Sequence, residues 1–138
     1  MRGERILIVD GNERDRQTLS NWLLAEGYQV LVAEDGAQAV NIARGDQPNL
    51  VLLNTSFPPD MSFGAGAFDD GFQVIDWLKR LKETEAIRFL LITDEDAAQL
   101  HGKARASGAK GLCQKPINRE TLLSIVQQIL GHVPPQPE

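Results

Sequence analysis

The chain has 138 residues, of which 42% are hydrophobic and 24% are charged, and its formal net charge is −5. These values are typical of one globular domain that is large enough to bury a core. The acidic balance argues against a nucleic-acid-binding surface, because phosphate binding requires clustered lysine and arginine side chains.

No stretch of the sequence predicts contact with a membrane. The longest apolar runs have about five residues, whereas a membrane-spanning helix needs about 20. No hydrophobic region of the signal-peptide kind follows residues 1–4. We therefore expect a soluble protein in the cytoplasm. The single cysteine, Cys113, lies in an apolar run and is expected to be a buried, reduced thiol.

Apolar runs in the first half of the chain predict three strands of a buried sheet. These strands are expected at 5–10, 28–33 and 49–54. Asn12 can cap the helix between the first two strands, and Gly27 can end it. A short helix is expected over about 36–44, because Asp35 and Gln38 resemble a capping box.

The segment 55–70 is too long for an ordinary connection between a strand and a helix, which has about 2–6 residues. It is rich in proline, glycine and phenylalanine. It is interpreted either as a surface excursion that one or two phenylalanine side chains hold, or as a binding loop that covers the strand edge.

Asp70 and Gln73 can cap the helix that follows this segment. Apolar residues then recur at i, i+3, i+4 and i+7, which predicts a helix face that packs in the core. The residues of this stripe are Val74, Trp77, Leu78 and Leu81.

The last third of the chain continues the alternation of strands and helices. The remaining strands are expected at 87–93 and 110–114. Thr93 or Asp94 can cap the helix between them, and Gly108 can end it. Asn118 can cap the final helix, and the proline-rich residues 132–138 are expected to form a tail or the start of a linker.

Strands that alternate with helices predict a doubly wound parallel α/β domain. Right-handed crossovers place all carboxyl ends of the strands at one edge, so Asp10, Asn54, Thr93 and Lys115 should converge there. An acid can hold a hard cation, and a hydroxyl and an ammonium can bind two oxygens of a phosphoryl group or carboxylate. Each residue alone could be a cap or a surface residue, so the joint placement is the functional signal.

With these strand ends in place, the sequence resembles the receiver domain of bacterial two-component response regulators, of the chemotaxis-Y type. The matching segments are Ile6–Asp10, Gly27–Tyr28, Ala33–Gly36, Pro48–Leu53, Asp70–Phe72, Leu91–Thr93, Gly108–Ala109 and Lys115–Pro116. The resemblance covers residues 4–131, and the domain is expected to span 1–131. It implies a three-layer (βα)5 fold of the flavodoxin type, with a five-stranded parallel sheet in the order 2-1-3-4-5.

The resemblance also implies a reaction, in which a histidine kinase transfers a phosphoryl group to an aspartate at the end of the third strand. Asn54 occupies that acceptor position. Family members hold Mg²⁺ with the acceptor and an acidic pair, which is reduced here to Asp10 and Gly11. Thr93 and Lys115 are retained at the positions that contact the phosphoryl oxygens.

Several departures from the family pattern concern this one reaction. An amide is not a nucleophile, so an acyl phosphate cannot form on Asn54. With Asp10 as the remaining carboxylate, a Mg²⁺ site is expected to be weak or absent, and no cofactor is expected. Asp94 would repel an incoming phosphoryl group, and Leu112 stands where the family has a switch aromatic. Pro116 is a candidate for a cis peptide bond.

We therefore predict an atypical receiver, or pseudo-receiver, that is not an enzyme and that acts through protein contacts. Lys115 is expected to pair with Asp10 and to hydrogen-bond the side-chain carbonyl of Asn54. The partner would be a histidine kinase, a phosphotransfer protein or a downstream effector. It would bind the face formed by the fourth helix, fifth strand and fifth helix, or the segment 55–70. A homodimer is a further possibility.

Two alternatives remain open at this point. The chain could accept a phosphoryl group at a substitute site among Thr55, Ser56 and Asp60, or Asn54 could be a laboratory change from aspartate. A flavodoxin-like cofactor binder is disfavoured, because residues 11–15 are charged and lack the hydroxyl-rich phosphate loop. The two histidines are expected to face solvent; they are His101 and His132.

Overall fold

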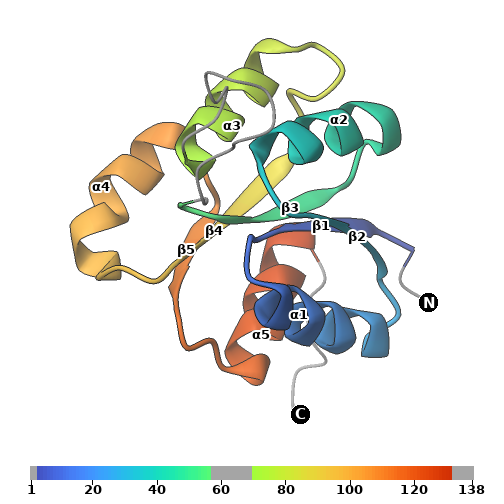
Figure 1. The fold of residues 1–138 in the computed structure, drawn as a ribbon, viewed down its shortest axis with the longest axis vertical. Helices are drawn as coiled ribbons and strands as arrows, with labels where there is room; N and C mark the ends of the chain where they lie inside the picture. Colours follow the sequence, from blue (N-terminus) through green and yellow to red (C-terminus); the bar gives the residue numbers. More distant parts are fainter. Residues whose placement is uncertain (1–2, 57–69, 132–138) are drawn as a thin grey trace.

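The computed structural model describes residues 3–56 and 70–131, in which strands and helices alternate along the chain (Figure 1). The strands are β1 (Arg5–Val9), β2 (Gln29–Ala33), β3 (Leu50–Asn54), β4 (Arg88–Thr93) and β5 (Gly111–Gln114). The helices are α1 (Glu13–Ala25), α2 (Gly36–Asp46), α3 (Gly71–Arg80), α4 (Ala97–Ser107) and α5 (Arg119–Leu130).

The strands form one parallel sheet in the order β2-β1-β3-β4-β5, which confirms the predicted fold. β3 lies in the middle of the sheet, and all its residues are buried. This burial explains the uninterrupted apolar run, since a central strand of a parallel sheet is covered on both faces.

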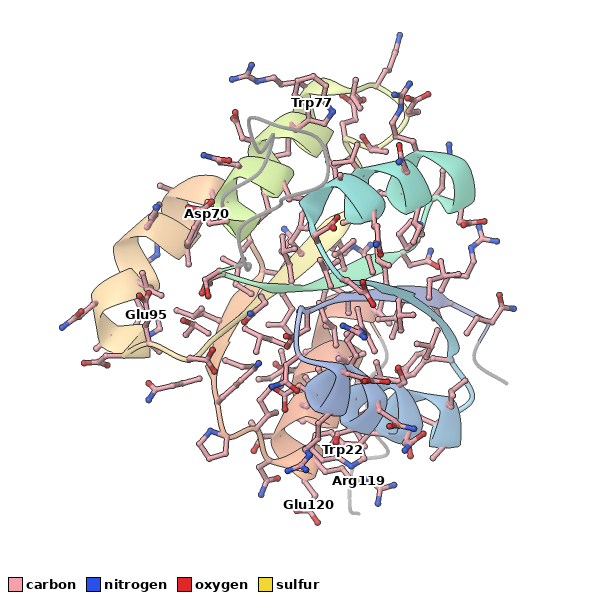
Figure 2. The ribbon with its side chains drawn as sticks, in the orientation of Figure 1. Trp22, Asp70, Trp77, Glu95, Arg119 and Glu120 are labelled. Carbon is pink, nitrogen blue, oxygen red and sulfur yellow. The ribbon has the colours of Figure 1, made fainter. Side chains whose placement is uncertain are left out.

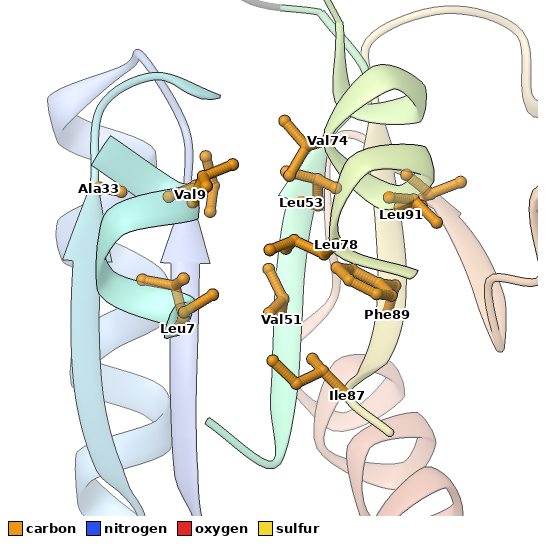
Figure 3. Packing of buried hydrophobic residues seen from close by; sticks show 14 of the residues in the cluster. Leu7, Val9, Ala33, Val51, Leu53, Val74, Leu78, Ile87, Phe89 and Leu91 are labelled. Carbon is orange, nitrogen blue, oxygen red and sulfur yellow. The ribbon is translucent and has the colours of Figure 1, made fainter. Parts of the chain in front are cut away.

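Two hydrophobic cores lie on the two faces of the sheet. Alternate strand residues such as Leu7, Val51 and Leu91 pack with Val74 and Leu78 of α3 on one face (Figure 3). The intervening strand residues pack with α1 and α5 on the other face. Figure 1 shows the resulting three layers, with α2 and α3 on the side of the sheet opposite α1 and α5. Cys113 is a free, buried cysteine of the second core, as predicted.

Four helices begin at the predicted caps, whose side chains accept a hydrogen bond from the backbone N–H three residues later. These caps are Asn12, Asp35, Asp70 and Asn118. The predicted cap of α4 is wrong, because Asp96 caps this helix and accepts from the N–H of Ala98 at 3.0 Å. The Thr93 hydroxyl instead accepts from the N–H of Glu95 at 3.0 Å, within the connection that precedes the helix.

The predicted core stripe of α3 is also partly wrong. Trp77 is 47% exposed on the outer face of α3, whereas Val74, Ile75 and Leu78 are buried (Figure 2). The i, i+1, i+4 set of these three residues faces the sheet, and Leu81, which follows the helix, packs beside it while partly buried. The periodic pattern therefore predicted the helix correctly, but it assigned Trp77 instead of Ile75 to the side that faces the core.

The end of α2 and the residues on either side of the segment 57–69 complete the description of the fold. α2 extends to Asp46, two residues beyond the predicted 36–44. Ser56 and Asp70 form an isolated antiparallel bridge. Expectations for residues 57–69 and 132–138, which include Asp60 and His132, lie outside the described residues. Within the described part of the chain, no helix is both long and apolar enough to cross a membrane.

Candidate functional site

A cleft of about 410 Å³ opens at the carboxyl end of the sheet. We refer to it as the strand-end cleft; its lining includes Asp10, Gly11, Asp15, Asn54, Asp94 and Lys115. Asp10 directly follows β1, Asn54 ends β3, and Lys115 directly follows β5. The sequence therefore placed these three residues together correctly, because each stands at the same end of a parallel strand.

The backbone fixes the positions of these strand ends. The N–H of Asp10 donates to the carbonyl of Ala33 at 3.1 Å, and the N–H of Lys115 donates to the carbonyl of Thr93 at 2.8 Å. Both bonds continue the pairing of neighbouring strands by one residue. The peptide bond between Lys115 and Pro116 is cis.

The ammonium group of Lys115 lies between two carboxylates. Its Nζ is 2.8 Å from Oδ2 of Asp10, as expected, and 2.7 Å from Oδ2 of Asp15. A third carboxylate, that of Asp94, lies 3.9 Å away. Burial lowers the pKa of Lys115, but the hydrogen bonds and charges of Asp10 and Asp15 outweigh it and raise the pKa above its ordinary value.

Asp15 was missed as a site residue by the sequence reasoning. It stands in the first turn of α1, where an acid is explained by the helix dipole alone. Its short separation from Asp10 in the sequence could have identified it. The first turn of α1 immediately follows the end of β1, so a carboxylate three residues beyond the Asn12 cap can reach the strand edge.

Asp10 is the most buried acid of the site, with 3% of its surface exposed. Its Oδ1 accepts from the N–H of Asn12 at 2.9 Å, and its Oδ2 accepts from Lys115. Its backbone carbonyl accepts from Nη1 of Arg16 at 2.7 Å. Each oxygen of this carboxylate therefore has a charged or backbone donor, which offsets the cost of its burial.

Asn54 is also buried, at 7% exposed, but only half of its amide is satisfied. Its Nδ2 donates to the carbonyl of Ser56 at 2.8 Å. Its Oδ1 has no hydrogen-bond partner among the described residues. The expected hydrogen bond from Lys115 to this carbonyl is therefore wrong, because Asp10 and Asp15 hold the ammonium group instead.

Thr93 does not join the other three residues in the lining of the strand-end cleft. It is fully buried, and its Oγ1 accepts from Oγ1 of Thr55 at 2.9 Å as well as from the N–H of Glu95. Thr55 follows Asn54 and is itself buried. Three of the four residues predicted to converge therefore line the cleft, whereas Thr93 is hydrogen-bonded to a second threonine.

The other predicted site residues are either exposed or packed against the core. Gly11 and Asp94 are exposed in the cleft lining, and Leu112 is partly buried against the core on the α3 side of the sheet. His101 is exposed on α4, as predicted. Gly71, which starts α3, belongs to a segment that matches the family, but no role of its own was predicted for it. A Cβ on this residue would lie 2.5 Å from the backbone oxygen of Asn54, so the close approach of α3 to the end of β3 requires glycine.

The donor set does not fit the divalent cation that the sequence resemblance implies. Among residues 3–56 and 70–131, no group of three or more histidine, cysteine, aspartate or glutamate side chains could hold a metal ion. The Lys115 ammonium already lies between Asp10 and Asp15, and Asn54 adds no charge. Mg²⁺ prefers several oxygen ligands of which one or two are carboxylates, and it would here compete with a positive charge for them.

Comparison with known proteins gives consistent matches over this fold. The model of the response regulator receiver domain family matches residues 6–127. Protein PilH of Pseudomonas aeruginosa is 34% identical over 129 residues, which cover 92% of this chain and 98% of PilH. The polar-differentiation response regulator DivK of Brucella ovis is 25% identical, with 91% and 95% covered. The structure of chemotaxis protein CheY4 of Vibrio cholerae superposes with a TM-score of 0.80 at 26% identity, covering 93% of this chain and 99% of CheY4.

Proposed function

The chain belongs to the response regulator receiver domain family, and we propose that it is a pseudo-receiver, which signals without phosphorylation at the end of β3. As a receiver domain of two-component signalling, it is similar to PilH and DivK. Receiver domains are signalling modules, and in this proposal the chain has no enzymatic activity of its own and works in the cytoplasm.

The observation that carries this proposal is the identity of the residue at the end of β3. Asn54 ends β3, at the position where the resemblance to receivers implies an acceptor aspartate, and it lines the strand-end cleft. Transfer of a phosphoryl group requires an attacking atom with an available electron pair. The lone pair of an amide nitrogen is delocalised into the carbonyl, and the amide carries no charge, so no acyl phosphate forms there.

The surrounding cleft supports the same proposal. Phosphoryl transfer depends on cations that neutralise the charge of the transferred group. Lys115, the cation of this cleft, is held by Asp10 and Asp15, and the donor set does not fit Mg²⁺. The exposed carboxylate of Asp94 adds a repulsive charge at the entrance.

The switch expected of a receiver is also restrained in this chain. The Thr93 hydroxyl is held by Thr55 and by the N–H of Glu95, and Leu112 replaces the aromatic side chain expected on β5. We propose that the signal is carried by binding to a protein of the pathway, either a histidine kinase, a phosphotransfer protein or an effector. The α4-β5-α5 face and the segment 55–70 are the candidate surfaces, and a homodimer through the first is compatible with this proposal.

An alternative is a receiver that accepts a phosphoryl group on a substitute residue. Ser56 favours it most, because its side chain is exposed and it lines the strand-end cleft. Thr55 is a weaker candidate, since its hydroxyl is buried and donates to Thr93. A laboratory change of aspartate to Asn54 would leave the remaining departures from the family pattern, Gly11, Asp94 and Leu112, unexplained.

The proposal is tested by intact-protein mass after incubation with acetyl phosphate and Mg²⁺. The natural chain is expected to gain no phosphoryl group, while a receiver that carries the acceptor aspartate is labelled in the same buffer. The variant Asn54→Asp shows whether the amide alone blocks the reaction. A phosphoryl group on the natural chain would overturn the proposal, and peptide mapping would then distinguish Thr55, Ser56 and Asp60.

A further inference from the structure

A second hollow, of about 280 Å³, lies beside the strand-end cleft, between α1 and the connection from β5 to α5. Its lining is mainly apolar and comes from Leu19 and Trp22 of α1 and from Pro116 and Ile117. We refer to it as the apolar pocket. Trp22 is partly buried and packs against the core on the α1 side of the sheet (Figure 2).

The strand-end cleft and the apolar pocket adjoin one another. Asp15 and Lys115 line both of them, so the ion pair of these residues forms the ridge between the two hollows. One surface thus has two halves of opposite character, a charged half and an apolar half.

The charged half carries a net negative charge. Its lining contains the carboxylates of Asp10, Asp15 and Asp94 and the ammonium of Lys115, which leaves it acidic at neutral pH. Further carboxylates stand around it, since Glu13, Glu95 and Asp96 are exposed at the starts of α1 and α4. Arg16 does not neutralise this edge, because it is engaged with the backbone carbonyl of Asp10 and with Glu34.

The unsatisfied oxygen of Asn54 is an independent indication of a ligand. This side chain lines the cleft, more than nine-tenths of it is buried, and Oδ1 lacks a donor among the described residues. A buried acceptor without a partner is unfavourable and rare in folded proteins. Oδ1 is covered by neighbouring atoms, so a group with N–H donors would satisfy it once the Asn54 side chain turns to uncover it, and positive charge on the same group would suit the carboxylates.

From these observations we propose that the strand-end cleft and the apolar pocket form one docking surface for a partner protein. The partner inserts an arginine side chain into the cleft and a neighbouring apolar side chain into the pocket. A guanidinium group suits the cleft, because its five donors lie in a fixed fork and it is less strongly hydrated than an ammonium group. Asp15 and Lys115 then lie between the two anchors.

This inference deepens the proposed function, on which it rests, by giving the chemistry of the partner. In an ordinary receiver the same cleft serves Mg²⁺ and the phosphoryl group, whereas here it is available for a side chain. The surface differs from the α4-β5-α5 face, because it is built from α1 and from the ends of β1, β3 and β5. A central apolar anchor beside a charged one is a common composition of the energetically important part of a protein interface.

The test uses the full chain and the small probe 4-phenylbutylguanidinium, which carries an apolar ring and a guanidinium group on one short linker. Binding is followed by ¹H–¹⁵N NMR without Mg²⁺ or a phosphodonor. The Trp22 indole N–H reports on the apolar pocket and the Asn54 side-chain amide on the cleft. Both are expected to shift together and to saturate with a dissociation constant of about 1 mM, typical of the efficiency of ligands of this size.

The chain supplies its own controls. The Trp77 indole lies on the outer face of α3, on the other side of the sheet, and is expected not to shift (Figure 2). Asp94→Asn is expected to weaken binding about threefold, because it removes one exposed charge of the cleft. Asp76→Asn removes an equally exposed carboxylate from α3 and is expected to leave binding unchanged; the exposed fractions are 66% and 68%.

The following results would overturn the inference. These are the absence of saturable shifts at Trp22 and Asn54, equal shifts of the Trp77 indole, and equal weakening by the two aspartate variants. 4-Phenylbutyrate, which replaces the guanidinium by a carboxylate, should not bind, and its binding with equal affinity would also contradict the cationic anchor. Because no phosphodonor is present, the outcome is independent of the mass measurement, so failure of the docking surface and failure of the pseudo-receiver proposal are distinguishable.

Discussion

Two small clusters lie at the carboxyl edge of the sheet, and they are held together in different ways. The first consists of Asp10, Asp15 and Lys115 and is ionic, with the ammonium side chain 15% exposed. The second is the neutral hydroxyl pair of Thr55 and Thr93, which is buried.

This difference predicts different responses. Water and ions can reach the ionic cluster, so its energy depends on pH, salt and ligands. The hydroxyl pair has no charge and little contact with solvent, so its contribution depends on packing and on keeping every donor and acceptor paired. Lys115 and Thr93 therefore each have a structural partner within the fold, Asp15 in one case and Thr55 in the other.

The largest effect on stability is expected from Asp10→Ala. Removal of this buried carboxylate leaves the Asn12 N–H without its acceptor and leaves Lys115 with Asp15 as its close partner. We expect a loss of about 3 kcal/mol in the free energy of unfolding, the range found when one partner of a buried ion pair is removed. Urea denaturation measures it as a lower midpoint at an unchanged m value. A loss below that of Asp15→Asn would contradict the assignment of Asp10 as the centre of the ionic cluster.

A smaller effect is expected from Thr93→Val, which keeps the shape of the side chain but removes the acceptor for Thr55 and for the N–H of Glu95. Leaving buried donors unpaired is expected to cost about 2 kcal/mol. Thr93→Ser keeps the hydroxyl and is the matched control. If the valine variant were as stable as the natural chain, the hydroxyl pair would have no structural role. Because the pair is neutral, the loss should not change with salt.

Asp15→Asn is expected to cost less stability than Thr93→Val, and its loss, unlike that of Thr93→Val, should depend on salt. The Asp15 side chain is 36% exposed, so loss of its charge is expected to cost only about 0.5 kcal/mol at low salt and less at high salt. The measurement is the difference in urea midpoint between the variant and the natural chain at two salt concentrations. A large loss that salt does not reduce would place Asp15 with the buried pair rather than with the ionic cluster.

The pH dependence gives the smallest expected signal. Asp10 and Asp15 raise the pKa of Lys115 in the folded chain above its ordinary value of 10.5. A raised pKa means that the stabilisation is complete below the ordinary value and is lost as the pH rises through the folded value. As the pH rises, the stability difference between the natural chain and Lys115→Met should therefore begin to shrink in strongly alkaline solution. A difference that disappears near neutral pH would contradict the ion pairs.

Much of the fold could be predicted from the sequence, because its signals are local. The apolar run of β3 reports burial on both faces, and the caps Asn12, Asp35 and Asp70 act on backbone groups only a few residues away. Trp77 was misplaced because Val74, Leu78 and either Ile75 or Trp77 fit a helical stripe, and the sequence does not say which face meets the sheet.

The site was predictable only to the level of which strand ends meet. Asp10, Asn54 and Lys115 share the cleft because parallel strands align their carboxyl ends. Which partner each side chain selects depends on competition in three dimensions. The Lys115 ammonium group binds the carboxylates of Asp10 and Asp15 rather than the neutral amide of Asn54, because hydrogen bonds between charged groups are stronger. The pairing of Thr93 with Thr55 likewise depends on the register of β3 and β4, which no local pattern encodes.

The most direct test of this account is a Mg²⁺ titration of the natural chain, beside Lys115→Met and the control Lys103→Met, an exposed lysine of α4. The backbone amides of Gly11 and Asn54, followed by NMR, report on the cleft. The account predicts no saturable shift in the natural chain or in Lys103→Met at millimolar Mg²⁺, and stronger binding by Lys115→Met, in which Asp10 and Asp15 are released. Saturation of the natural chain at lower Mg²⁺ concentrations, with an affinity equal to that of Lys115→Met, would contradict the claim that Lys115 takes the place of the divalent cation.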